Sequence, residues 1–340
     1  MRSTPRSGAI DAVRVLGIVA VVTGHVWANE FISKGLYSWH VPLFFFLTGY
    51  LWKPGRALVA EFHNRFRTLV KPYLFWLFVI LALWVAVNYV KSDLTLGDVA
   101  HPLYGGFFAT RPFSAFWFVT VLFFAAMAYR ALERVPVAAR WSIFLGGLLA
   151  GYLVGDLLAR TPLSAGSAWP CLSFLALGGL FRRIEPRFGV PFATGVSLLL
   201  GSSALIVMGW SAPLDIKQGD YGTPVLGVAV SVGICAGLVL VAKAIFAHVP
   251  AGVNRAITVL AQAGFVVILS HAVALLVLGT TSAGGANDFL ITLVAPWGLG
   301  LILLRTRLSP WATGIDRPAG SALHPHDAPA SPATDRTMGS

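Results

Sequence analysis

The sequence predicts an all-α membrane protein, a polytopic helix bundle of about ten transmembrane helices with both termini in the cytoplasm. Three observations predict this class: the composition, the length of the apolar stretches and the placement of basic residues between them. Of the 340 residues, 56% are hydrophobic and only 11% are charged, whereas soluble domains carry about 25% charged residues. Because so apolar a chain cannot cover a soluble globule with polar surface, we expect lipid to surround it.

Apolar stretches of suitable length divide the chain into ten expected spans. The second and the sixth are short, and either could be tilted or broken. The ten spans are residues 9–28, 38–52, 72–90, 114–131, 140–158, 167–181, 191–210, 223–246, 257–279 and 288–304.

The basic residues support this count through the positive-inside rule. With the N-terminus inside, twenty of the twenty-five Lys and Arg residues fall in segments that would face the cytoplasm. Losing or adding one helix would put the later basic segments on the wrong side. The five basic residues that fall elsewhere are Lys34, Lys91, Arg111, Arg160 and Lys217.

We expect one transmembrane domain over residues 1–307 and a disordered cytosolic tail over residues 308–340. The tail is rich in Pro, Ala, Ser and Asp and has no apolar face. The first apolar run is interpreted as a retained helix rather than a signal peptide, because Asp11 and Arg14 lie inside it. Small residues at every fourth position let membrane helices pack closely. One such series is Gly147, Gly151 and Gly155.

The composition also limits the classes of function. A net charge of +11 in a membrane protein is typical of loops that face anionic headgroups, so we expect no nucleic-acid partner. Cys171 and Cys235 lie in apolar runs and are interpreted as packing residues, because they form no metal pattern and no disulfide framework.

Ionisable residues inside a membrane span are costly and are usually functional. The first span contains three: Asp11, Arg14 and His25. Arg14 and His25 are eleven residues apart, which puts them within about 20° of one helix face and roughly 16 Å apart along it. The simpler interpretation is an Asp11–Arg14 ion pair with Arg14 reaching toward the interface, and a His25 satisfied by a neighbour. For His25, flanked by apolar residues, we favour a functional role.

Two further histidines are expected at a similar depth. His40 begins the second span, and His271 lies in the ninth. Three histidines in the outer half of the bundle predict a polar cavity there. We expect no metal in it, because no carboxylate or cysteine accompanies the histidines at ligand spacing.

Several segments resemble the membrane acyltransferase-3 family, in particular its fucose 4-O-acetylase-like branch. The stretch from Asp11 through Arg14 to His25 is similar to the Arg-x10-His first helix of that family. The block His40-Val-Pro-Leu-Phe-Phe-Phe-Leu-Thr-Gly-Tyr50 resembles its second-helix signature, with Thr48 in place of a serine. Weaker similarities lie in a basic segment before the third helix, at the start of the fourth helix and in a late helix with a histidine. These are Arg65-Phe-Arg67 through Lys71-Pro-Tyr73, Phe116-Trp117-Phe118-Val119 and Ile268-Leu-Ser-His271.

The resemblance implies O-acyl transfer from cytosolic acyl-CoA, commonly acetyl-CoA, to a hydroxyl of a glycan or glycolipid at the bacterial inner membrane. Acyl-CoA is then a co-substrate, and no bound cofactor is expected. His25 is the expected general base, because a hydroxyl needs a positioned base and imidazole titrates in a useful range. Arg14 is expected to steer the donor toward His25. His40, or a polar backbone site, is expected to stabilise the oxyanion. The other residues expected to line the cavity are Asp11, Tyr50, Trp117 and His271.

The phosphates of CoA need cationic partners on the cytoplasmic face. Arg65, Arg67 and Lys71 are expected to supply them, since Arg can bind a phosphate in a bidentate manner. The alternative for this basic segment is charge that only sets the topology.

Two other functions remain open from the sequence. A transporter or flippase of envelope precursors also has about ten helices with buried charge, although it predicts internal repeats that the chain lacks. A non-enzymatic scaffold of a polysaccharide assembly complex would not require a buried His25.

Overall fold

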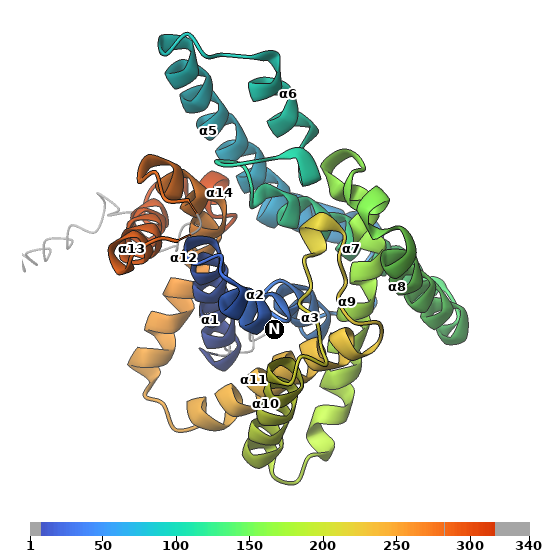
Figure 1. The fold of residues 1–340 in the computed structure, drawn as a ribbon. Helices are drawn as coiled ribbons and strands as arrows, with labels where there is room; N and C mark the ends of the chain where they lie inside the picture. Colours follow the sequence, from blue (N-terminus) through green and yellow to red (C-terminus); the bar gives the residue numbers. More distant parts are fainter. Residues whose placement is uncertain (1–7, 282, 317–340) are drawn as a thin grey trace, which may run out of the picture.

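A computed structural model describes residues 8–281 and 283–316. In these residues the secondary structure is helical, apart from one isolated β-bridge between Trp27 and Ala283. The all-α prediction is confirmed. The α-helices in Figure 1 are α1 (Gly8–Val26), α2 (Glu30–Tyr37), α3 (Pro42–Tyr50), α4 (Leu58–Arg65), α5 (Lys71–Val90), α6 (Leu96–Tyr104), α7 (Phe116–Ala131), α8 (Val137–Ala159), α9 (Ala168–Ile184), α10 (Pro191–Val207), α11 (Leu226–Phe246), α12 (Ala251–Val277), α13 (Ala286–Leu303) and α14 (Ser309–Ala312).

Within the described residues, eight helical segments are long and apolar enough to cross a membrane. They coincide with eight of the ten expected spans. The seventh expected span is the shorter helix α10, with 17 residues. The second is corrected: α3 has nine residues and is only about 13 Å long. A turn over residues 38–41 separates it from α2, and Pro42, which cannot donate a backbone hydrogen bond, begins the new helix.

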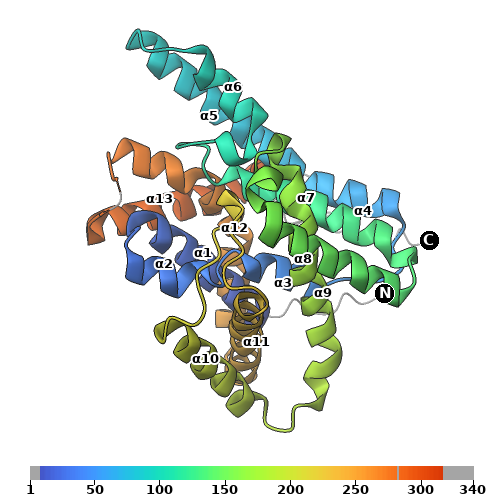
Figure 2. The ribbon, with the colours of Figure 1, turned by 45° about the vertical axis from the view of Figure 1, so that its right-hand side comes forward.

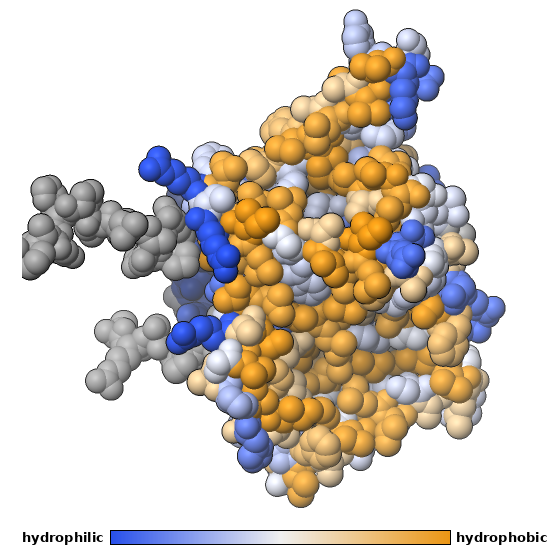
Figure 3. Space-filling model, turned by 90° about the vertical axis from the view of Figure 1, so that its left-hand side faces the viewer, coloured by the Kyte–Doolittle hydropathy of each residue, from blue (hydrophilic) through white to orange (hydrophobic). Residues whose placement is uncertain are grey.

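The surface agrees with a lipid environment. Figure 3 shows a face that is mostly hydrophobic, with hydrophilic side chains gathered mainly toward its margins. In Figures 1 and 2, α5 and α6 extend beyond the rest of the bundle. Large apolar side chains of α5 stay exposed there, including Leu83 and Val90. Such a surface is stable in lipid and not in water.

Two expectations about basic and polar segments are corrected. The basic segment before the third span, which the family resemblance implies is a loop leading into that helix, is itself helical: helix continues from Leu58 to Val90 through a π-helical turn, η1 (Phe66–Val70). The expected tail is packed in its first part: the indole of Trp76 donates to the carbonyl of Ala312 at 2.9 Å. Residues 317–340 lie outside the described residues.

Close helix contacts hold the centre of the bundle. Helices α3 and α9 lie side by side (Figure 2). A Cβ atom at Gly49 would lie 1.8 Å from the carbonyl oxygen of Leu175, and one at Gly178 would lie 2.0 Å from that of Phe46. The two helix backbones therefore touch, and this contact holds the short helix α3 within the bundle.

The glycine series of α8 is confirmed as a packing face, but it has two partners. Gly147 faces Trp169 of α9. Gly155 faces the loop of residues 208–225 between α10 and α11, where an added Cβ would lie 2.0 Å from the carbonyl oxygen of Gly219. Gly219 has a φ of +79°, a conformation that favours glycine. The series therefore positions this loop, which we call the α10–α11 loop.

We predict that Gly155→Leu displaces the α10–α11 loop and destabilises the protein by roughly 1–3 kcal/mol through overpacking. Thermal unfolding of detergent-solubilised protein would measure the change. Gly146→Leu is the matched control, since its Cβ meets no atom within 4 Å. Equal losses in the two variants would contradict the prediction.

Candidate functional site

A cavity of about 220 Å³ opens where α1 ends and α7 begins. Segments far apart in the sequence build it: α1, the end of α2, the turn that follows it, the start of α3, α7, α12 and the α10–α11 loop. Its lining residues are Val21, His25, Tyr37, His40, Val41, Phe44, Ala115, Trp117, Phe118, Leu214, Asp215, Ile216, Lys217, Gln218 and Ile268. Three of the predicted site residues, His25, His40 and Trp117, are thus brought together. We call this space the histidine cavity.

His25 lies in the last turn of α1 and faces the histidine cavity. Its ring centroid is 5.0 Å from that of His271 on α12. The Nδ1 of His271 lies 3.0 Å from the carbonyl oxygen of Val267 and must carry hydrogen to donate to it. The Nε2 of His271 then keeps its lone pair, and this buried atom has no hydrogen-bond partner among the described residues. His271 therefore presents an acceptor close to His25.

His40 is buried, and its tautomer is set in the same way. Its Nδ1 donates to the carbonyl oxygen of Leu36 at 2.7 Å, so the Nε2 of the neutral ring is an acceptor. The edge of Tyr37 contacts the ring, with centroids 4.9 Å apart. A neutral His40 can accept a proton or a hydrogen bond in the cavity, but it cannot donate one to an oxyanion.

Lys217 and Asp215 also line the histidine cavity, and no sequence motif indicated either residue. Both belong to the α10–α11 loop. The ammonium of Lys217 donates to the carbonyl oxygen of Ala109 at 2.8 Å, and burial lowers its pKa to about 8. Burial raises the pKa of the Asp215 carboxyl. The cavity therefore contains a cationic donor next to its histidines, with two N–H bonds beyond the one that Ala109 accepts.

Arg111 fixes the end of α1. Its guanidinium donates to the carbonyl oxygens of His25 at 3.1 Å and Thr281 at 3.2 Å, and also to that of Thr280. One side chain therefore joins the segment before α7, the end of α1 and the segment after α12. Helix α1, which carries His25, and helix α12, which carries His271, both end at this junction. Arg111 therefore fixes the position of one helix relative to the other.

The remaining predicted cavity residues lie elsewhere. Asp11 is buried and forms an ion pair at 2.8 Å with Arg14, and Arg14 lies eleven residues before His25. The hydroxyl of Tyr50 donates to Glu185 at 2.7 Å, and Lys243 also pairs with that carboxylate. None of these groups lines the histidine cavity. The terminal ion pair considered for Asp11 and Arg14 is present.

The predicted donor-binding residues have partners within the chain. Arg65 pairs with the buried Glu61 at 2.7 Å. Arg67 pairs with Asp316 at 2.8 Å, and the Lys71 ammonium lies 3.8 Å from the ring centroid of Trp311. All three lie at the end of the bundle that is expected to face the cytoplasm, which we call the basic end.

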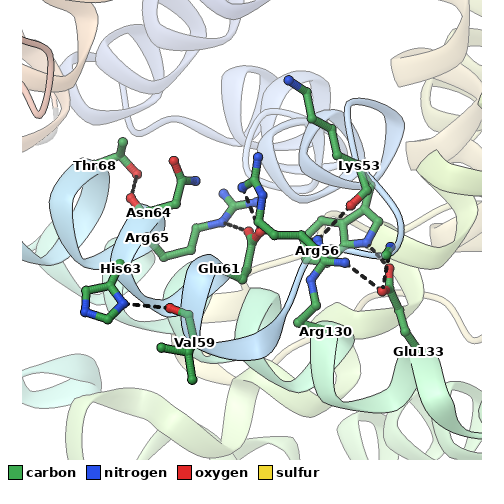
Figure 4. Close-up of polar contacts among 12 residues, drawn as sticks. Lys53, Arg56, Val59, Glu61, His63, Asn64, Arg65, Thr68, Arg130 and Glu133 are labelled. Carbon is green, nitrogen blue, oxygen red and sulfur yellow. Dashed lines mark hydrogen bonds and ion pairs between the residues drawn. The ribbon is translucent and has the colours of Figure 1, made fainter.

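Figure 4 shows the ion-pair cluster at the basic end. The carboxylate of Glu61 also pairs with Arg56 at 2.9 Å and with the buried Arg130 at 3.2 Å. Arg130 donates to Glu133 at 2.6 Å and to the backbone carbonyl of Lys53 at 2.9 Å. The cluster therefore joins α4 to α7 and to the segment after α3.

One signal in the sequence could have found the missed residues. Of the five basic residues that do not follow the positive-inside rule, Lys217 lines the histidine cavity and Arg111 binds at its edge. A basic residue on the side of the membrane where the positive-inside rule disfavours it indicates a specific role for that residue. The sequence could not indicate which of the five had one.

We predict that Arg111→Met lowers stability by about 2 kcal/mol or more, because three backbone carbonyls lose a charged donor. The apparent melting temperature in detergent would report the loss. Lys91→Met removes an exposed cation that is also outside the basic end and should have no such effect. A melting temperature unchanged by Arg111→Met would show that the junction does not depend on the guanidinium.

Comparison with known proteins gives the following matches. The acyltransferase-3 family model, described as an acyltransferase domain, matches residues 7–306. The Nodulation protein NolL of Mesorhizobium japonicum is 25% identical over 186 residues, which are 50% of this chain and 48% of that protein. The chain therefore matches about half the length of this curated relative. No solved structure matches the chain.

Proposed function

Because the chain belongs to the acyltransferase-3 family, we propose that it moves an acyl group, in the first instance acetyl, from acyl-CoA to a hydroxyl of a cell-envelope glycan or glycolipid. Its apolar helices and its family support a multi-pass membrane acyltransferase, and we place it in the bacterial inner membrane. The observation that carries the proposal is the histidine cavity, in which His25 faces an enclosed space beside a second imidazole and an ammonium.

The transfer needs a base and a donor for the oxyanion. The acceptor hydroxyl oxygen attacks the thioester carbonyl carbon while the His25 imidazole takes its proton. The carbonyl electrons move to oxygen and form a tetrahedral oxyanion. When the C=O bond forms again, the C–S bond breaks, and the CoA thiolate leaves with the proton held by His25. The products are an ester and CoA.

His271 is proposed as the positioning residue for His25. Its Nε2 lone pair is fixed by the hydrogen bond that Nδ1 donates to Val267. If one His25 nitrogen donates to this lone pair, the other nitrogen is left as the base that faces the cavity. The imidazolium formed during transfer is then stabilised by the same acceptor.

Lys217 is proposed as the oxyanion donor in place of His40. The neutral His40 presents an acceptor at Nε2, whereas the Lys217 ammonium has N–H bonds to donate into the same cavity. A donor already held by Ala109 in a partly desolvated site needs little reorganisation when charge develops. His40 can instead accept a hydrogen bond from the acceptor substrate.

The donor is proposed to reach His25 from the basic end. Arg14, about 16 Å from His25 along α1, lies toward that end. The Asp11 carboxylate fixes its guanidinium at 2.8 Å. Arg14 can therefore steer the extended pantetheine arm along α1 rather than act at the reacting atoms.

We predict that His25→Ala lowers kcat by about 10²- to 10⁴-fold, the usual contribution of a general base, at an unchanged protein level. His101→Ala, which changes an exposed histidine on α6, is the control. His271→Gln should lower kcat less and leave the KM for acyl-CoA unchanged. Release of CoA in the presence of an envelope glycan fraction would measure the rates. Wild-type turnover in His25→Ala would refute the role of His25 as the general base. A wild type that releases no CoA with any such fraction would instead favour a transporter or flippase.

We predict an alkaline fall in kcat/KM. The Lys217 pKa is lowered to about 8, so the ammonium is present below that pH and is lost as the pH rises through it. Lys217→Arg keeps a cation to a much higher pH and should shift the fall upward, whereas Lys217→Met should lower activity and abolish the fall. Rates between pH 6 and about 10 would test this. A fall at the same pH in Lys217→Arg would assign it to another group.

A further inference from the structure

Two adjoining hollows at the basic end form one groove between the segment after α3, the end of α7, the start of α8 and the end of α9. Their volumes are about 490 and 760 Å³. The residues that line both hollows are Trp52, Pro54, Tyr129, Arg140 and Arg183. We call their union the arginine groove.

The arginine groove carries a large excess of positive charge. It is lined by seven cationic side chains and one carboxylate, that of Glu133. Three of the seven cationic side chains bind groups within the protein. Arg56 and Arg130 form ion pairs with Glu61, and Arg182 donates a hydrogen bond to the Trp52 carbonyl at 2.9 Å. No carboxylate in residues 8–281 and 283–316 forms an ion pair with the other four. These are Lys53, Arg134, Arg140 and Arg183.

Aromatic side chains form the wall of the groove beside this charge. The indole of the buried Trp52 donates to Glu133 at 2.5 Å, and its ring lies 4.2 Å from the Arg130 guanidinium carbon. Tyr129 stacks on Phe144, with centroids 5.6 Å apart, and Trp141 also lines the groove. Aromatic faces beside several arginines bind a base and its phosphates.

The groove is also placed to serve the histidine cavity. Helices α3 and α7 border both spaces: Phe44 and Trp117 line the histidine cavity, and Gly49 and Tyr129 line the groove. Trp117 and Tyr129 are twelve residues apart on α7, about 18 Å along the helix. An extended ligand held by its charged end in the groove would point along these helices toward His25.

From this geometry we propose that the arginine groove binds the nucleotide and phosphates of the CoA donor, with Arg140 and Arg183 as the principal phosphate ligands. The inference rests on the proposed function. It replaces the expected role of Arg65, Arg67 and Lys71, since the first two are held by carboxylates and Lys71 by the ring of Trp311. Within the part of the chain that the structure describes, Arg140 and Arg183 have no carboxylate partner to lose when they bind a phosphate.

The test is binding of CoA, without an acyl group, to the purified full-length protein by isothermal titration calorimetry. The variant is Arg140→Gln/Arg183→Gln. The matched control is Arg187→Gln/Arg255→Gln, which removes the same charge from exposed positions that do not line the groove. We expect the groove variant to bind CoA about tenfold or more weakly, to raise the KM for acyl-CoA and to leave kcat nearly unchanged. We expect the control variant to bind like the wild type.

The outcomes separate the two proposals. If the wild type binds CoA and the groove variant binds it equally well, the assignment of the groove is overturned while the proposed function stands. If the wild type binds neither CoA nor acetyl-CoA, the proposed donor fails, and the groove assignment fails with it. Lipid headgroups also carry phosphate, so a last measurement compares retained phosphatidylglycerol by native mass spectrometry. Loss of that lipid in the groove variant, with CoA affinity unchanged, would assign the groove to lipid and overturn the inference.

Discussion

The cost of leaving a polar group without a partner in hydrocarbon is the constraint on which this structure depends. Glu61 shows its effect most clearly. A single buried carboxylate pairs with Arg56 and Arg65, which are close to it in the chain, and with Arg130 of α7. Breaking such a cluster at one member leaves uncompensated buried charge. The cluster therefore fixes α4 against α7 and shapes the basic end.

At the opposite end of the bundle, Arg111 joins the chain segments through backbone carbonyls rather than through a carboxylate. Arg111 donates to backbone carbonyls at the end of α1 and after α12, the two helices that carry His25 and His271. The last carbonyls of an α-helix have no hydrogen-bond partner within that helix. One guanidinium can donate to several of them at once. The same contact that stabilises the helix ends thereby aligns the two imidazoles.

The basic end and the end with the histidine cavity, both bordered by α3 and α7, differ in their chemistry. The basic end offers arginines and aromatic rings to the proposed phosphorylated donor, and the other end offers imidazoles and an ammonium to the proposed acyl transfer. Phe44 of α3 and Phe118 of α7 join the two helices where they line the histidine cavity, with ring centroids 5.4 Å apart. An extended thioester with a charged head is the kind of molecule that can occupy both ends at once.

The sequence by itself determined the membrane class and the position of most helices, and it singled out His25, which lines the histidine cavity. These depend on local hydropathy and on the cost of a titratable group in an apolar run, both of which can be read along one helix. It also located His40 and Trp117. Only the tertiary structure decided that Lys217 and Asp215 line the histidine cavity, that Arg111 binds at its edge, that Arg67 pairs with Asp316 and that Tyr50 lies outside the cavity. The physical reason is that helix packing brings these groups together across long separations in the chain, whereas hydropathy and spacing describe one segment at a time.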